Sequence, residues 1–459
     1  MSSRSCRCAR AVLVLTAGLV WGQAPAGDDL ARAMNLAAQG RFPEAEQVLR
    51  AIEKTHRNGF EVRYRLGLVL LRQGKAPEAA ARFEAAVQIS QDSALAWLGL
   101  AQSRLKLGQR DTALQAAGRA ARLGAEEPPL WRALAIFYSD ANEFAHAAEF
   151  EERWSRTRGA DSGSGLRLCR LRVRAGDGKR ALEACLRAMA GPESFELQQL
   201  LGDAYRLAGD AARAVEAYQR AIHLDPAAPS SYFRLVALFL DHRTPLPAIA
   251  VLESAVARFH KDSEFRRLLG LAHYQTGDFD KAIREFLSVL DIDPDAEAGY
   301  ASLETLLPKA GARLPEIVER LRGFRARRPD SPVGHFLLAR ALAQRENPPE
   351  AEVESLLRQA VQVDPNFWPA HIEVARLRET QGRLEDAIQS LERGVKLNPE
   401  YAAAHYSLAQ LYAQKGDRAR AVEHRKKHHA LLDRERTRAE RARVETPALQ
   451  FRIEPPSGR

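Results

Sequence analysis

Apolar residues recur along most of the chain at the three- and four-residue spacing of amphipathic α-helices. Residues 201–226 predict two such helices, separated by a turn at Gly209 and ended by Pro226. Glycine adopts the left-handed backbone that ends a helix, and proline disfavours helical geometry in the residue before it. The apolar faces are formed by Leu201, Ala204, Tyr205 and Ala208 and by Ala214, Tyr218 and Ala221. The stretch therefore predicts a helix–turn–helix unit.

This unit recurs along the chain, mostly at intervals of 34 residues. The turn positions hold Gly40, Gly74, Gly108, Asn142, Gly176, Gly209, Arg243, Gly277, Gly311, Gly382 and Gly416. Five residues after most of these turns stand Ala45, Ala79, Ala113, Ala147, Ala181, Ala214, Ala248, Ala282, Ala387 and Ala421. Two antiparallel helices can pack closely only where side chains are small, so we expect these alanines at the helix contacts. A fixed period of this length is typical of helical repeat proteins.

The unit resembles the tetratricopeptide repeat, which has Leu-Gly, Tyr, a turn Gly, Ala, an aromatic, Ala and Pro in this order. The strongest matches are Leu201, Gly202, Tyr205, Ala214, Tyr218, Ala221 and Pro226 in residues 195–228, and Leu269, Gly270, Ala282, Phe286 and Pro294 in residues 263–296. Good matches are Leu66, Gly67, Ala79, Phe83 and Ala86, and Trp97, Leu100, Ala101, Ala113 and Ala120. The resemblance implies an all-α, right-handed superhelical solenoid of about twelve helix–turn–helix tetratricopeptide repeats.

The chain divides into four predicted parts. We expect a signal peptide at 1–24, N-terminal repeats at 26–158, C-terminal repeats at 159–430, and a basic helix extension with a disordered tail at 431–459. The loose stretch at 155–165 predicts a flexible point, followed by a short first helix. Pro308 and Pro315 predict a second irregularity in residues 297–330.

Charge and composition bear on the location of the protein. The chain is 46% hydrophobic and 28% charged, which excludes the disordered and fibrous classes. Its formal net charge of +9 gathers at Arg4, Arg7 and Arg10 and in residues 418–443, so the body is neutral and does not favour a nucleic-acid groove. The early arginines precede the apolar run 11–22, and Gly22 and Ala24 are spaced for cleavage. We therefore expect an exported protein, periplasmic or secreted; a retained membrane anchor is the alternative.

The sequence offers no motif that predicts catalysis, a cofactor or a metal site. It contains no HExxH, no GxxxxGK[ST] and no GxSxG pattern, so we expect no enzyme activity. His424 and His428 share a helical face but stand among Arg and Lys, which favours a solvated basic helix. After signal cleavage the remaining cysteines are Cys169 and Cys185, in one unit. In an oxidising compartment they can form a disulfide, and the alternative is two buried thiols.

The resemblance implies a partner protein or peptide, bound by side chains of the first helices. In this register the candidates are Tyr64, Leu68, Leu98, Gln102, Arg132, Arg170, Arg174, Phe233, Arg267, Tyr274, Ile372, Arg376 and Tyr406. The family's carboxylate clamp uses asparagine at the ninth unit position, which the positions read from Leu68 to Gln410 lack. Chaperone-type EEVD tails are therefore not expected as ligands.

Function is predicted as a non-catalytic protein–protein interaction scaffold in the cell envelope. One alternative is a regulatory or assembly subunit of a multi-protein enzyme or of a secretion or polysaccharide system. Another is that the basic segment 418–443 binds an anionic surface or nucleic acid, although capping of the last unit is the favoured role for that segment.

Overall fold

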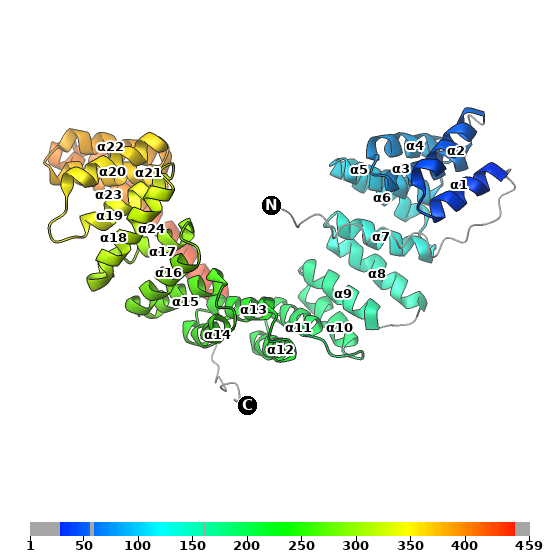
Figure 1. The fold of residues 1–459 in the computed structure, drawn as a ribbon, viewed down its shortest axis with the longest axis horizontal. Helices are drawn as coiled ribbons and strands as arrows, with labels where there is room; N and C mark the ends of the chain where they lie inside the picture. The colour runs from blue at the N-terminus through cyan, green and yellow to red at the C-terminus, as the bar shows by residue number, and fades with distance from the viewer. Residues whose placement is uncertain (1–27, 56–58, 159–161, 446–459) are drawn as a thin grey trace. The chain divides into compact units, whose positions relative to one another are not determined.

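The computed structural model describes residues 28–55, 59–158 and 162–445. Within these ranges the chain forms 24 α-helices, two short 3₁₀ helices and no strand (Figure 1). The expected signal peptide at 1–24 and the expected tail after residue 445 lie outside the described residues. The helices form pairs joined by short turns, which confirms an all-α helical repeat solenoid with about twelve units.

Contacts between helices divide the chain into two compact units, with the boundary between Ala217 and Tyr218 inside α12. The first unit contains α1 Asp28–Ala38, α2 Phe42–Thr55, α3 Phe60–Arg72, α4 Ala76–Ile89, α5 Ala94–Lys106, α6 Arg110–Leu123, α7 Pro128–Asp140, α8 Phe144–Arg158, α9 Ser162–Arg174, α10 Gly178–Ala188 and α11 Phe195–Leu207, with α12 Ala211–Leu224 crossing the boundary. The division of the repeats that the sequence indicates at 158/159 stays a prediction. The helices on either side of that point are joined by ion pairs, Arg167 with Glu151 at 2.7 Å and Arg172 with Glu152 at 2.9 Å.

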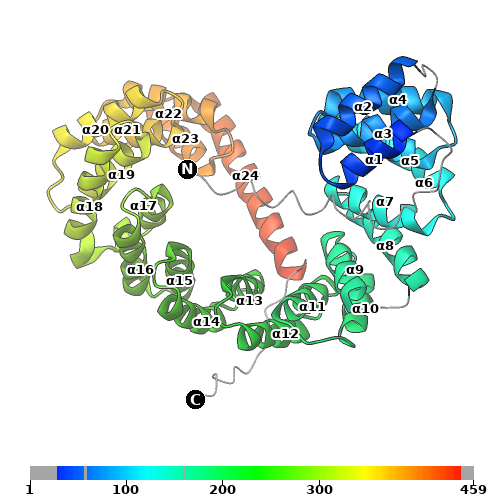
Figure 2. The same cartoon turned by 45° about the vertical axis from the view of Figure 1, so that its right-hand side comes forward.

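The second unit follows as a stack of helix pairs from α13 to α23 (Figure 2). Its helices are α13 Pro229–Asp241, α14 Pro245–Arg258, α15 Ser263–Thr276, α16 Phe279–Ile292, α17 Glu297–Glu304, α18 Leu314–Arg327, α19 Pro332–Ala343, α20 Glu350–Val363, α21 Trp368–Thr380, α22 Leu384–Leu397, α23 Ala402–Lys415 and α24 Arg418–Glu445. The irregularity expected near Pro308 is present, since α17 has only 8 residues and is followed by 3₁₀ turns at Leu307–Lys309 and Gly311–Arg313. The short first helix expected after residue 162 is wrong, because α9 has 13 residues, like α11.

The turns between paired helices adopt the backbone that the repeat predicts. All eleven turn positions have positive φ, from 49° at Gly311 to 87° at Gly416. Two of them are not glycine: Asn142 has φ 59° and Arg243 has φ 53°. The positions were predicted from period alone, so the period identifies a backbone conformation even where the residue type does not favour it.

Replacement of Arg243 by glycine is expected to raise the free energy of unfolding by about 0.5–1 kcal/mol. An L-residue with a β-carbon is strained by roughly 1–2 kcal/mol in the left-handed region, and the entropy that glycine loses on folding offsets part of the gain. Urea denaturation followed by circular dichroism measures the change. Asn142→Gly is the control and should gain less, since asparagine tolerates this conformation. An Arg243→Gly protein no more stable than the parent would contradict the prediction.

Small residues sit where paired helices touch. The alanines that follow the turns by five residues are buried, nine of them with 0% exposure and Ala421 with 4%. Large side chains then pack against glycines of the first helices. A β-carbon added to Gly270 would lie 2.6 Å from the ring of Phe286, and one added to Gly99 would lie 2.4 Å from the ring of Phe83. The steric reason proposed for the repeat pattern is confirmed.

A recurring contact joins each of several units to the unit before it. A ring near the start of the first helix donates a hydrogen bond to the carbonyl oxygen six residues earlier, in the short loop that follows the preceding second helix. We call these rings the junction rings: Trp97, Trp131, Tyr232, Tyr300, His335, His371 and His405, with donor–acceptor distances of 2.9–3.3 Å. Three kinds of side chain thus bind the same carbonyl position in successive units.

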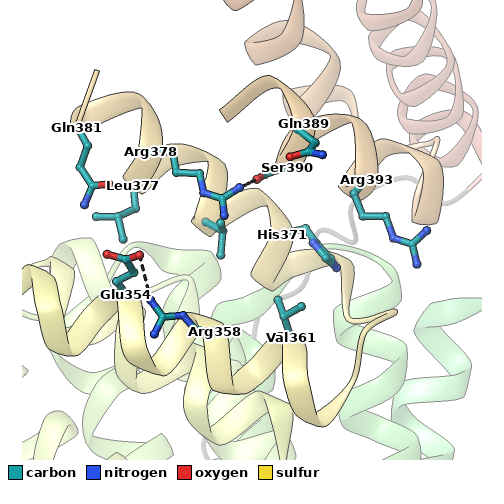
Figure 3. Close-up of a pocket in the computed structure, with 11 residues that line it drawn as sticks. Glu354, Arg358, Val361, His371, Leu377, Arg378, Gln381, Gln389, Ser390 and Arg393 are labelled. Carbon is teal, nitrogen blue, oxygen red and sulfur yellow. Dashed lines mark hydrogen bonds and ion pairs between the residues drawn. The ribbon is translucent and has the colours of Figure 1, made fainter. Parts of the chain in front are cut away.

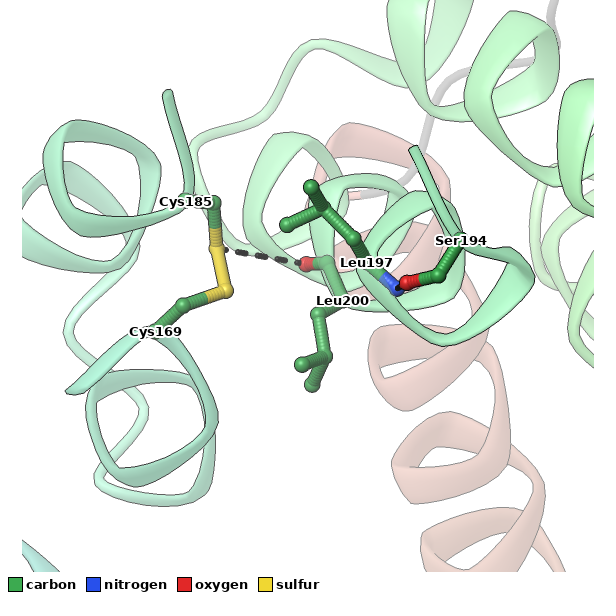
Figure 4. The surroundings of a disulfide bond; sticks show 5 residues. All are labelled: Cys169, Cys185, Ser194, Leu197 and Leu200. Atoms are coloured by element: carbon green, nitrogen blue, oxygen red, sulfur yellow. Dashed lines mark hydrogen bonds between the residues drawn. A yellow bond between two sulfur atoms is a disulfide. The ribbon is translucent and has the colours of Figure 1, made fainter. Parts of the chain in front are cut away.

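The structure joins Cys169 of α9 to Cys185 of α10 by a disulfide (Figure 4). The two α-carbons are 4.7 Å apart, and both side chains are fully buried. The sulfur of Cys185 also lies 3.8 Å from the carbonyl oxygen of Leu200 in α11. The bond therefore links the two helices of one unit at a point where the next unit packs on them.

Candidate partner-binding surface

The thirteen candidate binding residues differ widely in exposure. Tyr64, Leu98 and Ile372 are core residues, with exposures of 6%, 2% and 9%. The ring of Tyr64 lies 5.9 Å from that of Phe60 and 6.0 Å from that of Phe83, and burial raises the pKa of Tyr64 to about 12. The structure thus assigns these three side chains to packing between helices and not to a binding surface.

Most candidate arginines already have an anionic partner on the protein. Arg132 binds Glu151 at 2.8 Å, Arg267 binds Glu264 at 2.6 Å and Arg376 binds Glu373 at 3.2 Å. Arg170 pairs with Glu196. Arg174 stacks its guanidinium 4.0 Å above the centre of the Phe144 ring. The first helices therefore present less free positive charge than the sequence indicates.

Two aromatic candidates are exposed on first helices. Tyr274 in α15 is 41% exposed and Tyr406 in α23 is 49% exposed. Phe233 in α13 is half-buried and stacks on Phe265, with ring centres 4.0 Å apart. Leu68 and Gln102 are also half-buried. Exposed aromatic rings on first helices can supply a large contact area to a bound peptide.

Helix α24 packs along α23 as the second helix of the last unit. Leu408, Ala409, Leu411 and Tyr412 of α23 are 0–3% exposed, so no open apolar face is left on that side of α23. Cations of α24 are partly paired with nearby acids: Arg420 with Asp417, Lys427 with Glu423, Arg434 with Glu400 and Arg436 with Glu440. This arrangement fits the favoured capping role of residues 418–443.

Histidines form part of the contact between α23 and α24. The Nδ1 atoms of His405 and His424 are 3.0 Å apart, while Nε2 of His405 donates to the carbonyl oxygen of Pro399 at 3.0 Å. A neutral His405 therefore has an unprotonated Nδ1, which accepts the Nδ1–H of His424. Burial, and next the neighbouring His405, lower the pKa of His424 from its ordinary value of 6.5.

Acidification is expected to weaken the packing of α24 through His424. Because the folded pKa of His424 is below that of the unfolded chain, the unfolded state takes up the proton first. The stabilising contribution is complete above pH 6.5 and is lost as pH falls through the lowered value. Thermal unfolding between pH 8 and pH 5 should show a larger loss for the parent than for His424→Gln, which keeps a donor but does not titrate. Identical pH profiles would contradict this assignment.

Two features of the described residues bear on function. Across residues 28–55, 59–158 and 162–445, no group of three or more His, Cys, Asp or Glu side chains is placed to hold a metal ion. In the same part of the chain, no helix combines the length and apolar character that crossing a membrane requires. His424 and His428 do not direct their ring nitrogens to one metal position. Nδ1 of His428 forms a hydrogen bond with the carbonyl oxygen of Ala402 at 3.0 Å.

Comparison with protein families gives matches along the chain. A family model described as "TPR repeat" matches residues 202–241 and 380–416. Two models described as "Tetratricopeptide repeat" match residues 30–94 and 235–297, and residues 70–137. Together the matched segments span slightly more than half of the chain. Comparison with curated proteins found no match.

Solved structures of helical repeat proteins resemble the chain at low identity. Yeast Tom70 is 14% identical with a TM-score of 0.39, and the match covers 91% of this chain and 95% of Tom70. The C-terminal part of a TPR repeat-containing protein from Cytophaga hutchinsonii is 16% identical with a TM-score of 0.41, covering 60% of this chain and 97% of that one. MamA is 24% identical with a TM-score of 0.29, covering 38% of this chain and 97% of MamA.

Proposed function

Since the chain belongs to the tetratricopeptide repeat family, whose repeats serve as protein–protein interaction scaffolds, we propose that it binds a peptide or helix of a partner protein along its first helices. The observation that carries this proposal is the exposure of Tyr274 and Tyr406, aromatic side chains on first helices of the same compact unit. Aromatic residues are the usual anchors of protein interfaces. Phe233 adds a third ring that is partly accessible.

The proposed ligand is a segment with apolar side chains and some negative charge. Rings at 233, 274 and 406 favour apolar contacts, while the paired arginines at 267 and 376 can exchange their own glutamates for acidic groups of a partner. The Arg267–Glu264 pair is partly exposed, and such a pair is worth only about 0–1 kcal/mol, so its exchange costs little. Glu373 is only 12% exposed, but it keeps Arg340 at 3.5 Å when Arg376 turns to a partner. Affinity would therefore come mainly from the aromatic rings.

The test compares partner recovery for three forms of the full chain isolated from its native cells after crosslinking. Tyr274→Ala with Tyr406→Ala removes the two exposed rings, and Leu246→Ala is the control, because Leu246 is 69% exposed on the second helix α14. We expect the double variant to recover at least tenfold less of the partner than the parent and the control do. Equal recovery by all three forms would exclude the first-helix surface as the binding site.

The proposal includes a location in the cell envelope. Its support is the signal-like pattern of residues 1–24, together with the disulfide between Cys169 and Cys185, which suits an oxidising compartment. N-terminal sequencing of the native protein should give a start at residue 25, and mass spectrometry after alkylation should find no free thiol at either cysteine. A start at residue 1 with two alkylated cysteines would overturn the location while leaving the scaffold function untouched.

A further inference from the structure

A cavity of about 390 Å³ lies between α20, α21 and α22 of the second compact unit (Figure 3). Its volume falls in the range of roughly 300–1,000 Å³ that is common for ligand sites. Its apolar side is formed by Val361 of α20 and by Val374 and Leu377 of α21. Guanidinium groups come from each of the three helices. The cavity thus combines an aliphatic wall with concentrated positive charge.

One of the arginines that line the cavity occupies a position that holds a ring in the best-matching repeat unit. Arg378 stands four residues before the turn at Gly382, as Tyr205 stands four residues before Gly209. Tyr205 is buried and fills its site with a ring, whereas Arg378 is half-buried and extends toward α22. There it donates to Oγ of Ser390 at 2.5 Å (Figure 3). It also donates to the carbonyl oxygen of Asp386 at 3.1 Å.

The charges around the cavity are not balanced. Arg358 has a carboxylate partner, Glu354, at 3.1 Å. Within the described residues, neither Arg378 nor Arg393 lies within ion-pair distance of a carboxylate. Three guanidinium groups therefore face one carboxylate. A partly buried cation that has only neutral hydrogen-bond partners gains more from an incoming anion than an exposed one, because the screening by water is weaker.

We propose that this cavity binds an acidic side chain of a partner segment together with an adjacent aliphatic residue. The planar fork of arginine matches the two oxygens of a carboxylate, and Arg378 and Arg393 supply two such forks. The aliphatic neighbour would pack on Val361, Val374 and Leu377. The proposal rests on the proposed function in one respect, namely that the ligand is a segment of a partner protein.

This contact is separate from the first-helix surface. Residues two positions apart on a helix project about 200° from each other, so Arg378 and Val374 lie on the side of α21 opposite Arg376. Arg376 belongs to the first-helix candidates and is paired with Glu373. One partner segment bound along the first helices would therefore leave the cavity free, and the cavity adds a second recognition point in the same unit.

The direct test is a titration of the full chain, with ¹³C-labelled leucine and valine methyls, followed by NMR. The probes are a capped pentapeptide with the core Leu-Glu-Leu, its neutral counterpart with the core Leu-Gln-Leu, and inorganic phosphate. We expect the acidic peptide to shift the methyl resonances of Val361, Val374 and Leu377 until they saturate. We expect its affinity to be at least tenfold higher than that of the neutral peptide. Equal binding of both peptides would overturn the proposal, as would saturation by phosphate without saturation by the acidic peptide.

Three substitutions to glutamine separate this site from its surroundings. Arg393→Gln changes an exposed side chain without an ion-pair partner, and it should lower the affinity for the acidic peptide at least fivefold. Arg378→Gln should lower that affinity at least tenfold. Arg376→Gln, on the opposite side of the same helix, should bind like the parent. If Arg393→Gln and Arg378→Gln also bind like the parent, the cavity is not the site.

The peptide titration also distinguishes this inference from the first-helix proposal. The double variant Tyr274→Ala with Tyr406→Ala should bind the acidic peptide as tightly as the parent, since neither ring lines the cavity. Loss of peptide binding in that variant would overturn the assignment to the cavity. Loss of partner recovery with unchanged peptide binding would support both sites separately.

Discussion

Replacement of Phe83 by alanine is expected to lower the free energy of unfolding by about 3–5 kcal/mol. The ring is completely buried and lies between two glycines of successive first helices. Added β-carbons at Gly67 and Gly99 would lie 3.0 Å and 2.4 Å from it. One side chain therefore fills the space between α3, α4 and α5. The helices cannot close this space after truncation without moving whole units toward each other.

Hydrogen exchange measured by mass spectrometry can locate the effect of Phe83→Ala. Amide protection should fall first in α3, α4 and α5, because each unit of a repeat protein is stabilised mainly by its neighbours. Phe195→Ala serves as the control, since that side chain is 37% exposed and belongs to the same compact unit. A loss of stability in Phe83→Ala no larger than in Phe195→Ala would show that the ring does not hold the helices together.

Replacement of Glu151 by glutamine is expected to cost about 2–3 kcal/mol of stability. The side chain of Glu151 is 3% exposed. It forms ion pairs with Arg132 of α7 at 2.8 Å and with Arg167 of α9 at 2.7 Å. Glutamine keeps the size but removes the charge and turns one acceptor into a donor that faces a guanidinium. The arginines are 20% and 37% exposed, so water reduces the penalty below that of a fully buried pair.

The matched control for Glu151→Gln is Glu149→Gln on the same helix. Glu149 is exposed, and its neutralisation should change stability by less than about 0.5 kcal/mol. Denaturation in urea at low and high salt provides a second readout. The loss caused by Glu151→Gln should persist in 1 M salt, because buried pairs are screened little. An effect that vanishes in salt would place Glu151 at the surface.

Much of the fold could be predicted because backbone conformation and steric fit determine which residues the repeat requires at fixed positions. The left-handed turns require glycine or a tolerated substitute at a fixed period, so Asn142 and Arg243 were found by position. The buried alanines follow from close helix contacts. The flexible point expected at 155–165 stays a prediction. The glycine and serine content on which it rests could not reveal the arginine–glutamate pairs between α8 and α9.

The candidate surface was harder to predict than the fold. Both the core and a binding face of a first helix repeat at helical spacing, so Tyr64 and Leu98 could not be told apart from exposed residues. The junction rings were missed because three different residue types, Trp, Tyr and His, supply the hydrogen-bond donor at the same repeat position. The cavity beside Arg378 depends on three helices, and no single stretch of sequence contains it.

The junction rings have a consequence for how such a chain can change its length. Trp97 binds the carbonyl oxygen of residue 91 and Trp131 binds that of residue 125, so the two contacts are related by one period. Deletion of residues 94–127 would place Trp131 four positions after Ser93, where Trp97 now stands. The new joint would have the same donor and acceptor as the old one. The junction hydrogen bond would therefore survive the excision of a whole unit. The ring of Phe83 would have to shift, because Ala133 would take the place of Gly99 and bring a β-carbon into the space that the ring fills.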